Sequence, residues 1–355
     1  MQHTPEPSRL PGGVAASGHR ACPSSADEDG SGSRVDCRGR AQPADVVLLT
    51  PFVDAIENEP APRASFLFRL VNLLAVVVPF IGLVAAIVLL WGVGFGWVHA
   101  GLLIGGYLLT GLGVTVGYHR LFTHKSFRTN RAVTAVLGVL GSMAVEGPIL
   151  AWVATHRQHH QHSDRENDPH SPHGHGDGFR GFLHGLLHAH FGWLFLGKQG
   201  DPDRYAPDLQ ADPLVRGISR LFVLWVVLGL AIPAGLAWVV TGAWTGAVLG
   251  LLWGGLVRVF LVHHVTWSIN SVCHLWGSRP YRTHDHSRNN PIFGVLGFGE
   301  GWHNNHHAFP ASARHGLAWW QFDLSYLVIR GLAFLRLARD VRLPRPEHVA
   351  SKRAA

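Results

Sequence analysis

Four long apolar runs constrain the fold of this chain more than any other feature. A helix needs roughly 20 apolar residues to cross the hydrocarbon core of a bilayer. The runs of about this length are Leu70–Trp91, Trp97–Tyr118, Leu221–Val240 and Trp244–Val262. Two short uncharged connectors, residues 92–96 and 241–243, join the runs in pairs. The sequence therefore predicts an all-α integral membrane protein with four transmembrane helices in two hairpins.

The distribution of charge orients these hairpins in the membrane. Basic residues gather at the ends of the runs away from the connectors, such as Arg63 and Arg69 before the first run and Arg279–Arg288 after the fourth. The positive-inside rule places this side, and with it both termini, in the cytoplasm. The net charge of +7 then belongs to cytoplasmic loops. We therefore expect no nucleic-acid partner, and three cysteines without a CxxC pair predict no disulfide framework.

The chain divides into three regions by composition. Residues 1–62 are rich in Pro, Gly, Ser and charge, which predicts a disordered N-terminal tail. Residues 63–342 form the membrane domain, and residues 343–355 form a basic C-terminal tail.

Three shorter apolar segments lie within the membrane domain. They are Ala132–Val145, Phe182–Leu196 and Leu324–Leu337. Runs of 10–14 apolar residues are more often interfacial or re-entrant than spanning. We therefore expect the first segment not to cross the membrane and the other two to lie at its surface.

Eight of the 25 histidines fall in three short boxes. The second box reads HRQHH (156–160) and the third HNNHH (303–307), so the histidines of each share one face of a helix. The first box, HRLFTH (119–124), spaces its histidines five residues apart, which is about 140° of turn on an α-helix. Those two rings converge only if the helix ends between them.

The three boxes predict a metal centre with two ions. All of them lie on the cytoplasmic side of the apolar runs, and a solvated basic face explains one box but not three of matching form. Neutral imidazole suits iron, zinc, copper and nickel. Eight nitrogen ligands exceed the coordination number of a single ion. We therefore expect a dinuclear, histidine-rich site at the cytoplasmic face.

The boxes also resemble those of a known family. The stretches HRLFTH, HRQHHQHSD followed by DPHSP, and GWHNNHH resemble the histidine boxes of integral-membrane fatty acid desaturases. The nearest resemblance is to bacterial acyl-CoA and acyl-lipid Δ9 desaturases, and a more distant one is to animal stearoyl-CoA desaturase. TWSINS (266–271) and HLWG (274–277) match that family too, and the resemblance covers roughly residues 65–340.

This resemblance implies a fold, a cofactor and a reaction. The fold is four transmembrane helices with a cytosolic, histidine-rich helical cap. The cofactor is a di-iron centre held by nine histidines, with Asn270 holding a metal-bound water. The ligands implied are His119, His124, His156, His159, His160, His274, His303, His306 and His307. The reaction uses O2 and two external electrons to place a cis double bond, at Δ9 by resemblance, in a saturated acyl chain.

Residues near the boxes are candidates for supporting roles. Asp164, Asp168 and Glu300 are candidates to orient the imidazoles from a second layer. Trp152, Trp267 and Trp302 are candidates to line an acyl tunnel. The remaining histidines receive plainer predictions: His170, His173 and His175 as solvated loop residues, and His263 and His264 as packing at the membrane interface.

Partners and alternatives follow from the same resemblance. The partners are a fatty acyl substrate carried on CoA or a lipid, the membrane lipid itself, and an external electron donor, either a ferredoxin or an NAD(P)H-dependent reductase. No nucleotide fingerprint or iron–sulfur motif stands in the sequence to replace that donor. The location implied is a bacterial cell membrane. A membrane di-iron lipid hydroxylase is the alternative enzyme, and a metal transporter is the non-enzyme alternative, although transporter ligands usually lie at the bilayer midplane.

Overall fold

The computed structural model describes residues 64–90, 95–197 and 199–354. All of them belong to one compact unit, residues 61–355. The predicted disordered tail, residues 1–62, and most of the first hairpin connector lie outside the described residues. The described chain is mostly helical, with one short pair of strands, as an all-α membrane fold requires.

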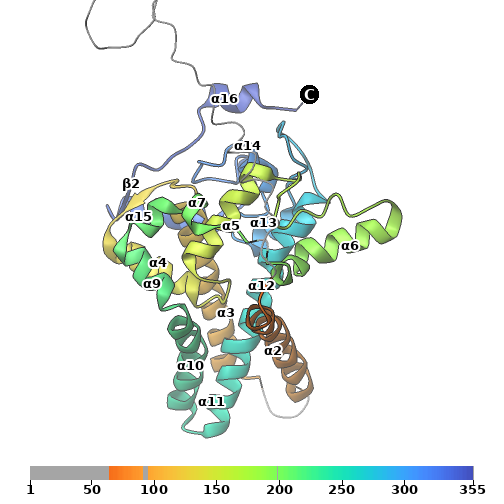
Figure 1. Ribbon diagram of the computed structural model, residues 1–355. Helices are drawn as coiled ribbons and strands as arrows, with labels where there is room; N and C mark the ends of the chain where they lie inside the picture. The colour runs from red at the N-terminus through yellow and green to blue at the C-terminus, as the bar shows by residue number, and fades with distance from the viewer. Residues whose placement is uncertain (1–63, 91–94, 198, 355) are drawn as a thin grey trace, which may run out of the picture. The chain divides into compact units, whose positions relative to one another are not determined.

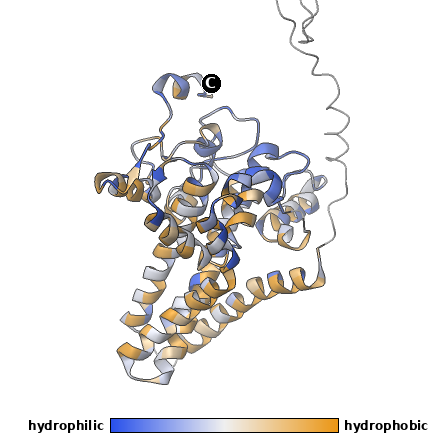
Figure 2. Cartoon of the chain, turned by 60° about the vertical axis from the view of Figure 1, so that its left-hand side comes forward, coloured by the Kyte–Doolittle hydropathy of each residue, from blue (hydrophilic) through white to orange (hydrophobic). Residues whose placement is uncertain are grey.

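Four helices are long and apolar enough to cross a membrane, which confirms the prediction of four spans. They are Phe66–Leu89, Trp97–Thr123, Phe222–Thr241 and Trp244–His274. Figure 1 shows them projecting from one side of a cap of shorter helices. Only 17% of the first and third spans is buried, against 50% of the fourth. The first and third therefore offer the most apolar surface to lipid, and Figure 2 shows the long helices as the hydrophobic part of the unit.

The spans consist of several helical segments. The first is α2 (Phe66–Leu90), and the third is α10 (Phe222–Thr241). The second combines α3 (Trp97–Leu112) with the π-helix η1 (Gly113–Thr123). The fourth runs through α11 (Trp244–Gly250), the π-helix η3 (Leu251–Val257), α12 (Arg258–Ser271) and a final turn, η4 (Val272–His274).

Two predicted ends of these spans were wrong. The fourth span continues past Val262 to His274, because its last turns leave the apolar region and are buried in the cap, where packing rather than hydropathy sustains the helix. The second span continues past Tyr118 and ends at Thr123, between His119 and His124, as the spacing of the first box predicted. It winds as a π-helix up to Thr123, and the His124 N–H bonds the His119 carbonyl at 3.1 Å. This i→i+5 pattern stacks residues five apart on one face.

Close packing against α4 (Arg131–Ser142) accompanies the π-helix. A Cβ at Gly113 would lie 2.3 Å from the Gly141 nitrogen, and one at Gly117 would lie 3.0 Å from the Leu137 carbonyl oxygen. Glycine at these two positions therefore lets the helices touch backbone to backbone. The Asn130 side chain caps α4 by accepting from the Val133 N–H. With twelve residues, α4 is too short to be a span, in keeping with the prediction for this segment.

The rest of the cap surrounds the ends of the spans that lie away from the hairpin connectors. Its helices are α5 (Ile149–His162), α6 (Gly178–His190), η2 (Gly192–Phe195), α7 (Pro202–Tyr205), α8 (Pro207–Gln210), α9 (Pro213–Arg220), α13 (Pro291–Leu296), α14 (His303–Ala308), α15 (Leu324–Phe334) and α16 (Pro346–Ser351). A short antiparallel pair, β1 (Arg128–Thr129) with β2 (Ala338–Arg339), ties the chain after α15 to the end of the second span. A buried cluster that includes Tyr118, Phe122 and Ile149 packs η1, α5 and α9 together.

The C-terminal segment, predicted as a basic tail, is ordered against the cap. It forms α16, and its backbone then pairs with the loop at residues 280–282. The Arg282 N–H bonds the Lys352 carbonyl at 2.8 Å, and the Ala354 N–H bonds the Pro280 carbonyl at 2.9 Å. Figure 1 shows α16 on the side of the cap away from the long helices.

Candidate metal centre

Nine buried or half-buried histidines meet in the cap as two neighbouring groups. The first group is His119, His124, His156, His160 and His306, and the second is His159, His274, His303 and His307. Within each group one nitrogen of every ring lies within 4.8 Å of the others. These are the nine positions to which the sequence assigned metal ligation. The second span supplies His119, and His124 follows its last residue. Helix α5 supplies three rings, η4 supplies His274 and α14 supplies the remaining three.

The ring nitrogens of these histidines point at one another. The Nε2 atoms of His119 and His306 are 3.0 Å apart, those of His306 and His160 are 2.9 Å apart, and those of His274 and His303 are 3.0 Å apart. The buried Nε2 atoms of His159 and His307 have no hydrogen-bond partner among the described residues. Converging, unpaired imidazole nitrogens fit a bound cation in each group, because a metal ion accepts lone pairs that protein donors leave unused.

Carboxylates behind four of these rings fix which nitrogen faces the centre. The pairs are His119 with Glu300 at 2.5 Å, His159 with Asp168 at 2.9 Å, His274 with Asp164 at 2.8 Å, and His307 with Asp285 at 2.7 Å. In every pair the Nδ1–H donates to the carboxylate, so Nε2 keeps its lone pair for a metal. The structure thus places the three acids singled out in the sequence directly behind ligand candidates.

Burial sets the charge of these groups. Burial lowers the pKa of His303 and His306 well below the ordinary value, and neighbouring imidazoles lower it further. Both rings are therefore neutral at pH 7, which is the form that binds metal. Burial also raises the pKa of Asp285. The facing His307 imidazole and hydrogen bonds from Ser287 outweigh that effect, so the net pKa of Asp285 lies well below its usual range. It is a carboxylate at any physiological pH.

A buried arginine links Glu300 to the last part of the cap. Arg120 has no exposed surface, and it contacts Asp323 at 2.8 Å and Glu300 at 3.2 Å. Asp323 also accepts the backbone N–H groups of Tyr326, at the start of α15, and of His315. The His315 ring lies 3.4 Å from Glu300, so one chain of contacts runs from α15 to the ring of His119.

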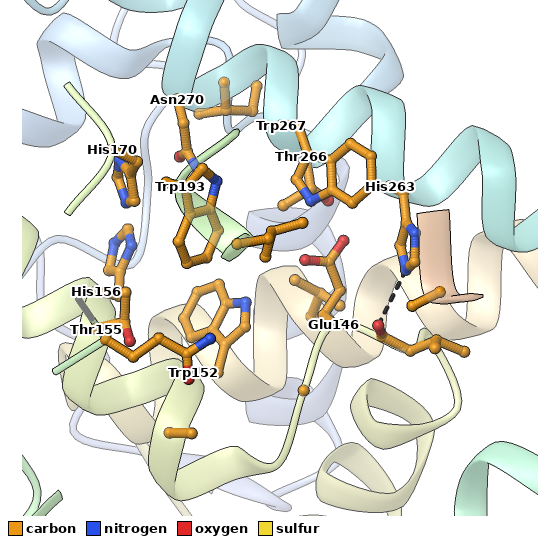
Figure 3. Close-up of a pocket in the computed structure, with 18 of the residues that line it drawn as sticks. Glu146, Trp152, Thr155, His156, His170, Trp193, His263, Thr266, Trp267 and Asn270 are labelled. Carbon is orange, nitrogen blue, oxygen red and sulfur yellow. Dashed lines mark hydrogen bonds between the residues drawn. The ribbon is translucent and has the colours of Figure 1, made fainter. Parts of the chain in front are cut away.

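An apolar cavity of about 450 Å³ adjoins the histidine groups. Its walls come from α2, η1, α5, α12 and the segment around η2, and His119, His156 and His303 stand in the wall on the side of the metal centre. A volume of this size is typical of a site for a small molecule. Figure 3 shows the cavity with Trp152, Trp267 and Asn270 around it. Trp152 stacks on His156, with ring centroids 4.9 Å apart and planes 18° apart.

Comparison with known proteins identifies the family. A sequence model described as fatty acid desaturase matches residues 95–333, which is well over half of the chain. The chain belongs to the fatty acid desaturase family. It is therefore an oxidoreductase.

Three relatives show how far this desaturase resembles known members. It is 47% identical to hex-5-enoyl-[acyl-carrier protein] acetylenase from Moorena producens (strain JHB), over 79% of this chain and 88% of that protein. It is 39% identical to sn-1 stearoyl-lipid 9-desaturase from Anabaena variabilis, over 70% of this chain and 86% of that one. It is 38% identical to palmitoyl-monogalactosyldiacylglycerol delta-7 desaturase from Arabidopsis thaliana, over 70% of this chain and 64% of that protein.

One predicted tunnel residue, Trp302, and one predicted loop residue, His170, lie elsewhere in this desaturase than the sequence suggested. Trp302 does not line the cavity, because its indole is buried against Gly294 and its N–H donates to the Phe322 carbonyl. His170 is not a solvated loop residue. It is buried, it lines the cavity, and its ring centroid lies 4.3 Å from that of His159. Asp168 accepts the His170 N–H, so the carboxylate that orients His159 also holds this loop inward.

Four buried residues of the desaturase were not predicted from the sequence. Asp285 lies in a polar loop 22 positions before the histidine that it orients. His315 and Asp323 follow the third box in a stretch with no helical spacing to indicate them. Only Arg120 stands inside a histidine box, but this position does not by itself predict burial, because Arg157 inside the second box is partly exposed.

Proposed function

We propose that this desaturase places a cis double bond, at Δ9, in a fatty acyl chain by means of a di-iron centre held by its nine clustered histidines. The observation that carries the proposal is the shared wall: His119, His156 and His303 belong both to the metal-ligand groups and to the apolar cavity. An acyl chain in that cavity would lie beside the metals and away from water.

The donor set fits iron. The centre offers nine imidazoles and four carboxylates, and the only cysteine among the described residues, Cys273, is buried without a place in either group. When bound, iron with O2 would supply the oxidising power that an unactivated methylene needs. The protein's task is then positional: Asp164, Asp168, Asp285 and Glu300 hold the rings, and the cavity walls exclude water. Asn270 lies in the cavity wall, where it would hold a metal-bound water.

The relatives support the substrate class and the position. One is named for a stearoyl lipid desaturated at position 9, and another for a carrier-protein ester. A hydroxylase of the same di-iron type would need the same histidines, and the family named by the comparisons favours desaturation over it. A transporter would hold its ligands between the spans, whereas these histidines stand in the cap.

Electrons would come from a separate ferredoxin or NAD(P)H-dependent reductase on the cytoplasmic side. The loop that contains Arg279, Arg282 and Arg288 lies in the cap close to His307, through Asp285. It would offer an acidic donor a basic surface. Arg120, which also stands near the boxes, is buried and takes no part in this surface.

Expression in a desaturase-deficient bacterial host tests the proposal, with the fatty acids analysed for double-bond position and for hydroxyl groups. We expect monounsaturated product at Δ9 from the wild-type chain and none from His159→Ala. His184→Ala, on the exposed face of α6, is the matched control and should retain activity within a few-fold. Hydroxy fatty acids in place of unsaturated ones would establish the hydroxylase alternative, and loss of product in both variants would contradict the assignment of the ligands.

A further inference from the structure

One carboxyl group in the wall of the cavity has no role in holding the metal centre. Glu146 and Glu300 both line the cavity, and Glu300 is engaged by His119 and Arg120. Glu146 instead interacts with the Thr266 hydroxyl and the Trp152 indole. Its Oε1 atom is buried from solvent and has no hydrogen-bond partner among the described residues. A buried polar atom without a partner is costly, and such atoms mark places where a ligand or a water completes the site.

The backbone around Glu146 is held in a strained conformation. Val145 has φ 67° and Gly147 has φ 105°. A positive φ is rare for a β-branched residue and persists only where its surroundings enforce it. Two side chains of the fourth span do so here: the His263 Nε2–H donates to the Val145 carbonyl at 3.0 Å, and Arg258 donates to the Met143 carbonyl at 2.6 Å.

His263, predicted only to pack at the membrane interface, thus fixes the backbone of this turn. These contacts clamp the turn between α4 and α5 so that the side chain of Glu146 enters the cavity. Figure 3 shows the carboxyl group between Trp152 and Thr266, beside the His263 contact to the turn. An apolar residue in the same place would leave no unpaired carboxyl oxygen in the wall, although it would remove the partner of the Thr266 hydroxyl and the Trp152 indole. The strained backbone at Val145 instead places a carboxyl group in the cavity wall.

The carboxyl group is neutral in this environment. Burial raises the pKa of Glu146 to about 8, although interactions with the Thr266 hydroxyl and the Trp152 indole partly offset the effect of burial. A neutral carboxyl group both donates and accepts hydrogen bonds, so it suits a partner that does the same. A hydroxyl group meets this requirement. An amine would need a charged carboxylate, and a ketone would only accept.

We propose that Glu146 is a recognition subsite for a hydroxyl group on the acyl chain, set in the cavity beside the metal centre. The proposal rests on the proposed function, in which the cavity holds an acyl chain. It adds that the enzyme distinguishes hydroxylated chains from plain ones, and that the position of the hydroxyl along the chain decides which one fits.

Ligand displacement on the full-length, metal-loaded protein tests this subsite. The fluorescent fatty acid cis-parinaric acid serves as the probe, and the competitors are palmitic acid and a series of monohydroxypalmitic acids with the hydroxyl at successive carbons. We expect at least one isomer to compete about tenfold better against the wild type than against Glu146→Leu, because leucine leaves the hydroxyl unpaired. Glu146→Gln should keep most of the preference, and palmitic acid should bind all three proteins alike.

The outcomes separate the two levels of the argument. If palmitic acid fails to displace the probe from the wild type, the cavity does not hold an acyl chain and both proposals fall. If palmitic acid competes but no isomer distinguishes the wild type from Glu146→Leu, the subsite alone is overturned.

An infrared measurement covers the case in which Glu146→Leu does not fold. The carbonyl stretching band of the protonated carboxyl group, identified by its absence in Glu146→Gln, should shift when the best-binding hydroxypalmitic acid is added and not with palmitic acid. A band that stays in place with every isomer refutes the subsite.

Discussion

Replacing Asp285 by asparagine should put a proton on the wrong nitrogen of His307. Oδ1 of Asp285 accepts from the Ser287 N–H at 3.0 Å and from the hydroxyls of Ser287 and Thr283, while Oδ2 accepts from His307 Nδ1 at 2.7 Å. The Ser287 N–H can only donate, so the amide oxygen of the introduced asparagine must take the Oδ1 place. The amide NH₂ then faces His307 and requires Nδ1 to accept, which moves the ring proton to Nε2.

The cost follows from the loss of one ligand in one group. Changes to such orienting partners typically weaken metal binding by about 10–100-fold. Because this substitution imposes the wrong tautomer rather than only removing a charge, we expect the upper end, about 100-fold, or about 2.7 kcal/mol. The effect should fall on the group that contains His159, His274, His303 and His307, and should leave the other group intact.

Titration of the iron-loaded protein with a competing chelator measures this. The wild type should release its two irons together at high chelator concentration, and Asp285→Asn should release one of them about 100-fold earlier. Asp177→Asn, at an exposed position before α6, is the matched control and should behave as the wild type. If Asp285→Asn retains both irons within about twofold of the wild-type affinity, the tautomer argument is wrong.

Three further predictions concern stability, topology and pH. Arg120→Met leaves two buried carboxylates without their cation, so it should cost roughly 3–5 kcal/mol in thermal or denaturant unfolding, against at most about 1 kcal/mol for Arg131→Met at a surface pair; equal costs would contradict the buried network. Single cysteines are introduced in a chain that lacks the two N-terminal cysteines. A cysteine at Lys125 should be labelled only from the cytoplasmic side, and one at Trp244 only from the opposite side. Labelling of both from one side would refute the four-span topology. Burial lowers the pKa of His170 to about 3, whereas an unfolded histidine titrates near 6.5. Unfolding therefore takes up a proton between these values, so the melting temperature of the metal-free protein should fall from pH 7 to pH 5, and His170→Gln should lessen that fall.

Hydropathy located the four long helices because a lipid-facing helix must carry about 20 apolar residues whatever it packs against. It failed where burial in protein replaces lipid. The turns of α12 beyond Val262 carry His263, Thr266 and Asn270, which read as the end of a span, yet the cap surrounds them. Packing partners that are distant in sequence decide whether a helix continues through such polar residues. Hydropathy does not reveal these partners.

The candidate ligands of the second and third boxes were predictable because helical spacing brings histidines together on one face, whereas His274 was implied only by the resemblance to the family. The partners behind them were predictable only where they stand near a box, as Asp164, Asp168 and Glu300 do. Asp285 and His315 come from irregular loops, where no periodicity links a residue to its position in space. The π-helix at Gly113–Thr123 was missed for a related reason: its hydrogen-bond register accompanies close contact with Gly141 of α4, which local sequence does not encode.

The buried ion pair of Arg120 with Asp323 joins residues 203 positions apart, so it can form only late in the synthesis of the enzyme. At 5–20 residues per second, a ribosome needs roughly 10–40 s to travel from the first histidine box to Asp323. Both membrane hairpins are made before that moment, so insertion into the bilayer precedes closure of the centre. Until then Arg120 lacks its ion pair with Asp323, and the histidines of the first two boxes are not enclosed by the rest of the cap. If the centre binds metal as proposed, the metal should be loaded only after this closure, and a nascent chain stalled before residue 323 should insert normally yet retain no metal.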